Sequence, residues 1–441
     1  MVVVAILTQP VAYCFAHLPS LSHMLSLLAA VLPVIAQSQP IRTAWSAEVP
    51  RQAVVAQSLG WLEQNFPRQV EEWVRIAEMQ GKSEHEQERG RYVRAVMERE
   101  GLRVTTDSIG NVIGVRKGRG GAPSVVFAAH LDIVHPLGTD LRVRRNGDTL
   151  HAPGIFDNSA SVANMLAVIR ALNAAKIETQ SDLIFIGTAQ EELGLNGMDY
   201  WFEHNPRPGL LISMDGGLGP INYGALGIYW TKYYYRGAGS HTNTSAGKPH
   251  PARAVAAAIQ SIYEIAIPEG RGGAVYNVGQ VHGGAIFNGI PQEVWFSLDL
   301  RSVNPTLLDS LDAEIDRRAR QAAEREKVEF VKEVVQKNRA GGTEEMLRDR
   351  RAHPLVQTAI DIQKWLDVQT GGRDALATGS TDGNEGVIRG IPSIAIGRSY
   401  GGNQHTLSEW AHWPSAILGT KLTLLLALTM GGAAGSLTPV Q

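Results

Sequence analysis

Cysteine is almost absent from this chain, since Cys14 is the only one among 441 residues. A disulfide framework and a thiolate nucleophile or metal site are therefore excluded for the body of the chain. Any bound metal must be held by histidine and carboxylate side chains. An excess of charge of one sign is also absent, because 41 basic and 43 acidic residues give a formal charge of −2. This balance, without a basic block, argues against nucleic acid as a partner.

Charged side chains are missing from the first 41 residues. The apolar run Met24–Ala36 predicts a signal peptide cleaved after Ala36, and hence a periplasmic or secreted protein. No Lys or Arg precedes the run, so a mis-assigned start codon and a cytoplasmic protein explain the segment equally well. The segment is interrupted by Pro10, Pro19 and Pro33. A removed leader over residues 1–41 is therefore favoured over a stable membrane span.

The body of the chain contains two kinds of pattern. With 441 residues, 44% of them hydrophobic, it can bury a large core, and we expect two domains. Residues 52–100 predict helices and residues 102–116 a β-hairpin. Residues 124–134 begin with a continuous apolar run, which favours a strand of a parallel sheet covered by helices on both faces. We expect a discontinuous α/β catalytic domain over residues 42–219 and 339–435.

The segment 220–338 has a different pattern. It predicts, in order, a strand, a helix, two strands, a helix and a strand, at residues 228–236, 250–267, 275–282, 293–301, 305–326 and 328–335. A βαββαβ order packs as an antiparallel sheet with two helices on one face. We therefore predict an α+β domain inserted between the halves of the α/β domain.

Residues with metal-binding side chains follow the ends of successive predicted strands in the α/β domain. They are His130, Asp132, Asp157, Glu191, Glu192, Asp215 and His405. Each alone has a simpler explanation as a surface acid, a helix cap or a structural histidine. Asp157, for example, opens a predicted helix that Asn158 or Ser159 can cap. Because ligands bind at the carboxyl edge of such sheets, the whole set predicts one site.

This set of side chains suits hydrolysis by two metal ions. Two Zn²⁺ ions about 3.5–4 Å apart can share a carboxylate and a water whose pKa falls toward neutrality, while an unligated carboxylate takes its proton. Two histidines, one bridging Asp and one further carboxylate on each metal supply the ligands, and one Glu remains as base. The spacing of His130 and Asp132 suits a ligand and the group that fixes its ring.

The ordered motifs His-x-Asp, Gly-x-x-Asp-Asn, Glu-Glu, Asp-Gly-Gly, Thr-Asp-Gly and a late His resemble those of a known family. It is the co-catalytic di-zinc exopeptidase and deacylase family of peptidase T, carboxypeptidase G, acetylornithine deacetylase and succinyl-diaminopimelate desuccinylase. The resemblance covers nearly all of the chain after residue 50. It implies two Zn²⁺ ions, with Co²⁺ or Mn²⁺ as alternatives.

The resemblance also assigns roles at the metal centre. His130 and Asp215 would hold one ion, Glu192 and His405 the other, and Asp157 would bridge them. Glu191 would be the general base and Asp132 the support of His130. The peptide bond between Asp157 and Asn158 would be cis. Phe156 departs from the family pattern, in which a small or acidic residue commonly stands. Glu409, four residues after His405, is either a supporting partner of the site or an exposed acid.

In this family the inserted domain is a lid and a dimerisation domain, which implies a homodimer here. His241 matches a histidine that stabilises the tetrahedral oxyanion, often across the dimer. Asn288 and Arg301 match residues that grip polar and carboxylate groups of the substrate. Asp382 would border the substrate pocket or fix the loop near His405. Equally simple explanations are a loop histidine, a turn residue and a surface ion pair.

The resemblance implies cleavage of an amide bond by a metal-bridging hydroxide with Glu191 as base. The run from Met214 to Tyr223 is close to that of peptidase T, which favours an aminopeptidase or tripeptidase acting on short peptides. The stretch from Asn288 to Arg301 looks equally like the desuccinylase branch, so an N-acyl-amino-acid deacylase is the alternative. A catalytically silent binding protein is a second alternative, against which the complete ligand set speaks.

Overall fold

A computed structural model describes residues 43–268, 273–368 and 378–433 of the chain. The predicted leader, with its cleavage point after Ala36, lies outside the described residues. So do the last two residues of the predicted catalytic domain, 434 and 435.

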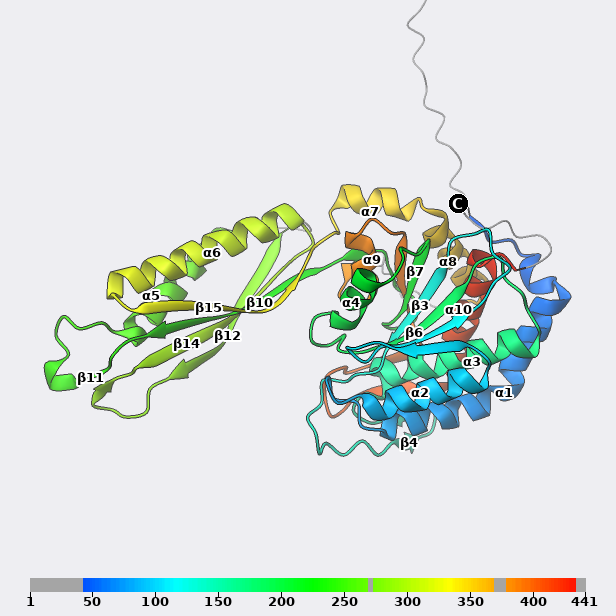
Figure 1. Ribbon diagram of the computed structural model, residues 1–441, viewed down its shortest axis with the longest axis horizontal. Helices are drawn as coiled ribbons and strands as arrows, with labels where there is room; N and C mark the ends of the chain where they lie inside the picture. The colour runs from blue at the N-terminus through cyan, green and yellow to red at the C-terminus, as the bar shows by residue number, and fades with distance from the viewer. Residues whose placement is uncertain (1–42, 269–272, 369–377, 434–441) are drawn as a thin grey trace, which may run out of the picture. The chain divides into compact units, whose positions relative to one another are not determined.

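A seven-stranded sheet forms the centre of the α/β part (Figure 1), in the order β1-β2-β6-β3-β7-β17-β8. Its strands are β1 Arg103–Thr106, β2 Val112–Arg116, β3 Val125–His130, β6 Leu183–Thr188, β7 Leu210–Met214, β8 Ile221–Asn222 and β17 Ser393–Ile396. The four middle strands, β6, β3, β7 and β17, are parallel, whereas β1, β2 and β8 pair antiparallel at the two edges. The predicted mostly parallel α/β sheet is confirmed.

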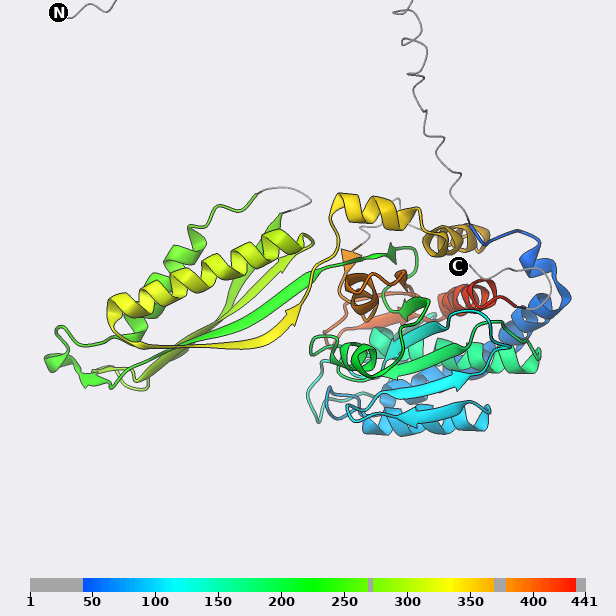
Figure 2. The same ribbon diagram turned by 45° about the horizontal axis from the view of Figure 1, so that its top comes forward.

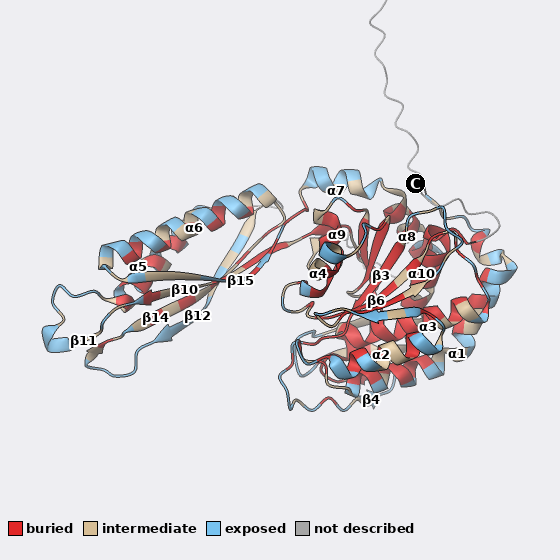
Figure 3. Ribbon diagram, viewed as in Figure 1, coloured by how far each residue is buried: buried red, intermediate tan, exposed pale blue. Residues whose placement is uncertain are grey.

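Helices cover both faces of this sheet (Figures 1 and 2). One face is covered by α1 Ala53–Glu78, α2 Gln87–Arg99, α3 Ala160–Ala174, α8 Pro354–Trp365 and α10 Ala416–Met430, and the other by α4 Asn196–His204 and α9 Gly383–Ile388. Strand β3 shows the consequence, because Phe127 contributes to one core while Val126 and Ala128 contribute to the other. The continuous apolar run therefore has a partner on each side, as the burial colours of Figure 3 show.

Helix α10 is the most apolar of these elements. Among the described residues, the stretch Trp413–Met430 is the single one that is long and apolar enough to cross a membrane, with a mean hydropathy of 1.3. However, 72% of that stretch is buried inside the structure, where α10 packs on α3 and α8. The apolar composition of α10 is therefore explained by its burial in the core.

A small antiparallel sheet brings the late part of the chain back to the first half. Its order is β18 Tyr400–Gly402, β19 Trp410–His412, β5 Thr149–His151 and β4 Arg144–Asn146. The β18–β19 connection carries His405, and β5 leads into the segment that carries Asp157. This pairing places two predicted ligands, about 250 positions apart in sequence, on neighbouring loops.

The segment between Gly227 and Asn338 builds a separate antiparallel sheet of order β12-β14-β10-β15. Its elements are β10 Gly227–Arg236, α5 Pro251–Tyr263, β12 Ala274–Gly283, β14 Glu293–Ser302, α6 Pro305–Glu326 and β15 Glu329–Asn338. Both helices pack on one face of the sheet, over a core that includes Tyr233 and Phe296 (Figure 2). The predicted βαββαβ order is confirmed.

Two short pairings and one further helix complete the strands and α-helices of the described residues. Strand β9 Gly224–Ala225 pairs with β16 Thr378–Gly379, and β11 Ser240–His241 pairs with β13 Gly289–Ile290. Helix α7 Glu344–Arg351 precedes α8.

The packing of β3 against β6 predicts a strong dependence on Phe185, which is fully buried and stacks on Phe127 with ring centroids 5.4 Å apart. Phe185→Ala should lower the free energy of unfolding by about 3–5 kcal/mol because it leaves a cavity between two close-packed layers. Phe287→Ala is the matched control, since Phe287 is fully exposed and its loss should cost less than about 0.5 kcal/mol. Urea unfolding of both variants measures the difference, and equal costs would contradict it.

Candidate active site

Metal-capable side chains converge at the carboxyl edge of the parallel strands. Their ligand atoms form three groups in which all atoms lie within 4.8 Å of one another. The groups are His130–Asp157–Asp215, Asp157–Glu192–His405 and His130–Glu191–Glu192. Asp157 belongs to the first two groups, so it occupies the shared position that a bridging carboxylate needs.

The two imidazole rings point their Nε2 atoms at carboxylate oxygens. His130 Nε2 lies 3.1 Å from Asp157 Oδ1. His405 Nε2 lies 3.1 Å from Glu192 Oε1 and 3.5 Å from Asp157 Oδ2. The two oxygens of Asp157 therefore face different histidines. A ring nitrogen and a carboxylate oxygen at this distance need a proton or a cation between them, and histidine with carboxylate is a donor set that suits zinc.

Asp132 organises the loop of the two glutamates as well as His130. Its carboxylate accepts the backbone N–H groups of Glu191 at 3.0 Å and Glu192 at 3.1 Å, and the Ser83 hydroxyl at 2.6 Å. The Nδ1 atom of His130 lies 3.0 Å from the Asp132 carbonyl oxygen and 3.5 Å from the Asp132 carboxylate. The main chain of Asp132 thus fixes the ring, while its side chain fixes the glutamates.

Glu409 holds the loop that carries Asp157. It is buried and accepts the backbone N–H groups of Gly154, Phe156 and Asp157 at 3.0, 2.8 and 2.7 Å. The alternative of an exposed acid at this position is therefore wrong. The peptide bond between Asp157 and Asn158 is cis, as the resemblance implied.

The predicted side-chain cap of α3 is wrong. Neither Asn158 nor Ser159 caps the helix, and the position before Ala160 has no side-chain cap hydrogen bond. Asn158 instead donates to the Met214 carbonyl at 3.0 Å and Ser159 donates to the Gly154 carbonyl at 2.6 Å. Both side chains are used to fix the fold of the Asp157 loop, so they are not free to turn toward the helix.

His405 adopts a left-handed backbone with φ +63°, as does Asn403 in the same loop with φ +58°. Non-glycine residues rarely take this conformation, and such strain tends to gather at functional sites. The side chain of His405 is 53% exposed while that of Glu192 is 10% exposed. The site therefore opens to solvent on the His405 side.

The clustered charges shift the pKa values of the site strongly. Burial lowers the pKa of His130, but the nearby carboxylates of Glu191, Asp132 and Asp157 outweigh it and raise that pKa well above its usual value. Burial and the charge of Glu192 hold the pKa of Glu191 well above its usual range. Hydrogen bonds to Asp157 and Glu192 raise the pKa of His405 to about 10. A metal ion that binds at this centre would have to displace protons from these groups.

Glu86 is a buried carboxylate that sequence reasoning missed. It precedes α2, accepts the Gln190 backbone N–H at 3.0 Å, and leaves its Oε2 atom without a hydrogen-bond partner among the described residues. Gln190 has φ +54° and stands directly before Glu191. Glu86 and Asp132 together therefore hold three consecutive N–H groups, those of Gln190, Glu191 and Glu192. Burial raises the pKa of Glu86 to about 7.

The structure does not add the predicted lid residues, or Asp382 of the α/β part, to the donor groups. His241 lies at the β11–β13 pairing, where Asn288 Nδ2 is 3.4 Å from its Nε2 atom. Arg301 forms an ion pair with Asp299 at 2.9 Å on the open face of the second sheet. Asp382 is buried and accepts the Thr188 hydroxyl at 2.5 Å, at the end of β6. The substrate roles of these residues stay predictions.

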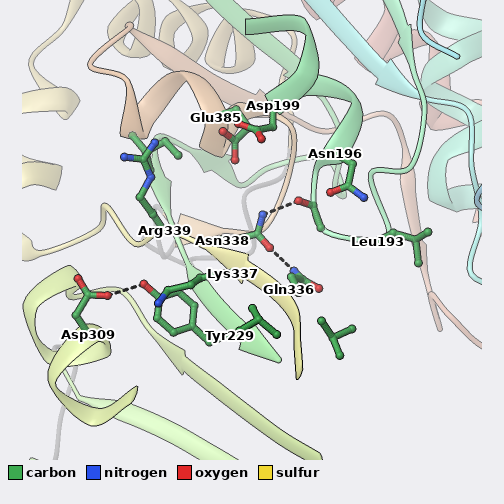
Figure 4. A pocket seen from close by; sticks show the side chains of 14 residues that line it. Leu193, Asn196, Asp199, Tyr229, Asp309, Gln336, Lys337, Asn338, Arg339 and Glu385 are labelled. Atoms are coloured by element: carbon green, nitrogen blue, oxygen red, sulfur yellow. Dashed lines mark hydrogen bonds between the residues drawn. The ribbon is translucent and has the colours of Figure 1, made fainter. Parts of the chain in front are cut away.

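The loop after Glu192 also contacts the end of β15. Asn338 Nδ2 donates to the Gly194 carbonyl at 2.7 Å, and Gln336 donates to Asn338. Figure 4 shows these bonds in a pocket that includes Asn196 from the start of α4 and Tyr229 from β10. A hydrogen bond thus ties the loop that follows Glu191 and Glu192 to the inserted segment.

Arg398 is the second group that sequence reasoning missed. It is buried, lies two residues after β17, and forms ion pairs with Asp157 and Asp215. The one available sequence signal was its position after the end of a buried strand, the same position that singled out the acidic residues.

The fold is the one found in solved structures of peptidases and amidohydrolases. Residues 111–267 match the model of peptidase family M28. A protein from Pyrococcus abyssi named as a LysW-lysine/LysW-ornithine hydrolase is 28% identical over 182 residues, which are 40% of this chain and 48% of that protein. The match therefore spans about half the length of that relative.

Solved structures match over a longer range. A tripeptidase from Staphylococcus aureus has a TM-score of 0.64 at 18% identity, over 82% of this chain and 97% of that one. A dinuclear metal-binding peptidase of the M20 family from Bacillus subtilis has a TM-score of 0.59 at 17% identity, over 83% of this chain and 98% of that one. The chain thus has the M28/M20-like peptidase fold, which confirms the resemblance inferred from its motifs.

The buried carboxyl of Glu86 predicts a pH dependence of stability. Its pKa rises from 4.5 to about 7 in the folded chain, so the folded state binds this proton more tightly than the unfolded state. The stability that Glu86 contributes is fully present below pH 4.5 and is lost as the pH rises through 7. Between pH 4.5 and 8, Glu86→Gln should therefore gain about 2–3 kcal/mol relative to the wild type.

Urea unfolding of chelator-treated protein at several pH values checks this prediction. The exposed residue Glu71 offers the matched control, because Glu71→Gln should track the wild type at every pH. A stability difference between Glu86→Gln and the wild type that does not change with pH would show that the Glu86 carboxyl has an ordinary pKa.

Proposed function

We propose that this protein is a zinc-dependent exopeptidase that hydrolyses an amide bond of short peptides from the amino end. The observation that carries the proposal is the sharing of Asp157 by two donor groups, His130–Asp157–Asp215 and Asp157–Glu192–His405. Two such groups fit a pair of metal ions, and Glu191 is left over as a base. The fold is that of metallopeptidases, which supports this class of chemistry.

The proposed ligands are His130 and Asp215 for one ion, Glu192 and His405 for the other, and Asp157 for both. When bound, the metal pair would supply a Lewis acid that polarises the amide carbonyl and eases deprotonation of water. Zn²⁺ is proposed because the donors are imidazole nitrogens and carboxylate oxygens, with Co²⁺ or Mn²⁺ as alternatives.

Glu191 would move the proton. It is buried, and its carboxylate lies in one donor group with His130 and Glu192. A carboxylate whose pKa is raised by burial holds a proton more readily than a free one, so it can accept a proton from water and later give it to the leaving amine. Its backbone N–H is held by Asp132 at 3.0 Å, so the loop presents the carboxylate in a fixed place. Asp132 would thus act as a positioning residue.

The preference for short peptides is proposed from two similarities. One solved structure of this fold is described as a tripeptidase, and the run from Met214 to Tyr223 resembles that of peptidase T. The alternative is an N-acyl-amino-acid deacylase, which the relative named as a LysW-lysine/LysW-ornithine hydrolase favours. In both cases His241, Asn288 and Arg301 would serve the substrate from the inserted segment, and a homodimer through that segment would bring them to the site.

Substitution of the two adjacent glutamates should have different effects on activity and metal content. Glu191→Gln should lower kcat by about 10²–10⁴-fold while the metal content stays unchanged, because the proton acceptor is lost and the ligands are kept. Glu192→Gln is the matched neighbour and should lose both activity and metal. Steady-state kinetics with elemental analysis of the same samples measures both effects. Loss of metal in Glu191→Gln would contradict the assigned roles.

A substrate panel tests the proposed reaction itself. The purified full chain, with its metal content measured, is offered tripeptides with a free amino end and the same peptides N-acylated. We expect release of the amino-terminal residue from the free-amino peptides alone. Release of the acyl group from the acylated set would establish the deacylase instead. Absence of both metal and turnover would contradict the enzyme proposal.

A further inference from the structure

Arg398 places a permanent positive charge inside the proposed metal centre. Its side chain is 1% exposed. One of its nitrogens, Nη1, donates to Asp215 Oδ1 and, at 3.0 Å, to Asn158 Oδ1. The other, Nη2, lies 3.1 Å from Asp157 Oδ1. The guanidinium therefore contacts both carboxylates of the His130 side.

The surroundings of Arg398 fix it in this place. Its guanidinium carbon lies 4.2 Å from the ring centroid of Phe156, which is fully buried. The backbone N–H of Arg398 donates to the Gly216 carbonyl at 3.2 Å, and its carbonyl accepts Asn164 Nδ2 at 3.1 Å. A cation stacked on a buried ring and held at its backbone has little room to swing away.

This packing explains the unusual Phe156. A Cβ added at Gly401 would lie 2.5 Å from the Phe156 ring. The ring therefore fits only because position 401 is glycine. Phe156 forms the floor on which the guanidinium of Arg398 lies, so both residues belong to one arrangement.

The guanidinium charge of Arg398 lies on one side of the Asp157 carboxylate. Oδ1 faces His130 and Arg398, whereas Oδ2 faces His405. Among the described residues, no Lys or Arg forms an ion pair with Glu192, whose carboxylate contacts His405. A permanent cation thus contacts two carboxylates of the His130–Asp157–Asp215 group. The Asp157–Glu192–His405 group shares only Asp157 with that cation, and its other positive charge is the proton of His405, which a metal would displace.

We propose that Arg398 is a resident cation that makes the two metal positions unequal. The position of Asp157, Glu192 and His405 binds its ion first and tightly. The position of His130, Asp157 and Asp215 binds the second ion weakly, because the guanidinium already occupies two of its carboxylate oxygens and repels a divalent cation. This inference rests on the two-metal centre of the proposed function.

A metal titration tests the proposal without any assay of activity. The full chain is stripped with a chelator and titrated with Zn²⁺ in a calorimeter, and the bound metal is counted by elemental analysis. The wild type should bind two ions in two steps whose dissociation constants differ by about tenfold or more. Arg398→Gln removes the charge and should lower the dissociation constant of the weaker step. The ratio of the two dissociation constants should therefore fall by about tenfold.

Two further variants control the experiment. Arg398→Lys keeps a positive charge and should therefore keep the difference between the two dissociation constants. Arg170→Gln removes an arginine that pairs with Glu72, outside the donor groups, and should titrate like the wild type. If Arg398→Gln does not fold, the two dissociation constants of the wild type and of Arg398→Lys still test the proposal.

The possible outcomes separate the inference from the proposed function. Two ions of equal affinity in the wild type, or weaker binding of both ions in Arg398→Gln, would overturn the role of Arg398 while leaving a two-metal enzyme intact. Failure of the wild type to bind any Zn²⁺ would instead overturn the metal centre itself.

Discussion

The site depends on the carboxylate of Asp157, which belongs to two donor groups at once. The acidic side chains around it repel one another unless cations lie between them. Five acidic side chains, Asp132, Asp157, Glu191, Glu192 and Asp215, gather at one sheet edge. Like charges at such distances cannot all stay ionised without cations between them. His130, His405 and Arg398 supply positive charge in the metal-free chain, and metal ions would do so when bound.

The rigidity of the site comes from buried hydrogen bonds to main-chain groups. Glu409 binds three N–H groups of the Asp157 loop, and Asp132 and Glu86 bind three of the Glu191–Glu192 loop. Each carboxylate thus fixes a loop that carries proposed ligands and not a single side chain. A site held in this way needs little reorganisation when substrate binds, which is the condition for electrostatic catalysis.

The location of the site follows from strand direction. Because β6, β3, β7 and β17 are parallel, their carboxyl ends meet at one edge, and residues from distant parts of the sequence become neighbours there. The small sheet of β18, β19, β5 and β4 then adds His405. The hydrogen bond from Asn338 to Gly194 joins this edge to the inserted segment, from which the family resemblance would bring residues that grip substrate.

The sequence by itself determined the α/β class, the βαββαβ insertion and the donor residues, because apolar runs and their polar ends are local patterns. Tertiary structure alone decided which atoms meet. Glu86 is an ordinary acid in sequence, and Arg398 is one of 41 basic residues. Glu409 stands near His405 in sequence, but only the structure decides between a supporting partner of the site and an exposed acid. Their burial and partners arise from segments up to 255 positions apart. Asn158 and Ser159 looked like helix caps because capping is a local preference, yet long-range packing gave both side chains other partners.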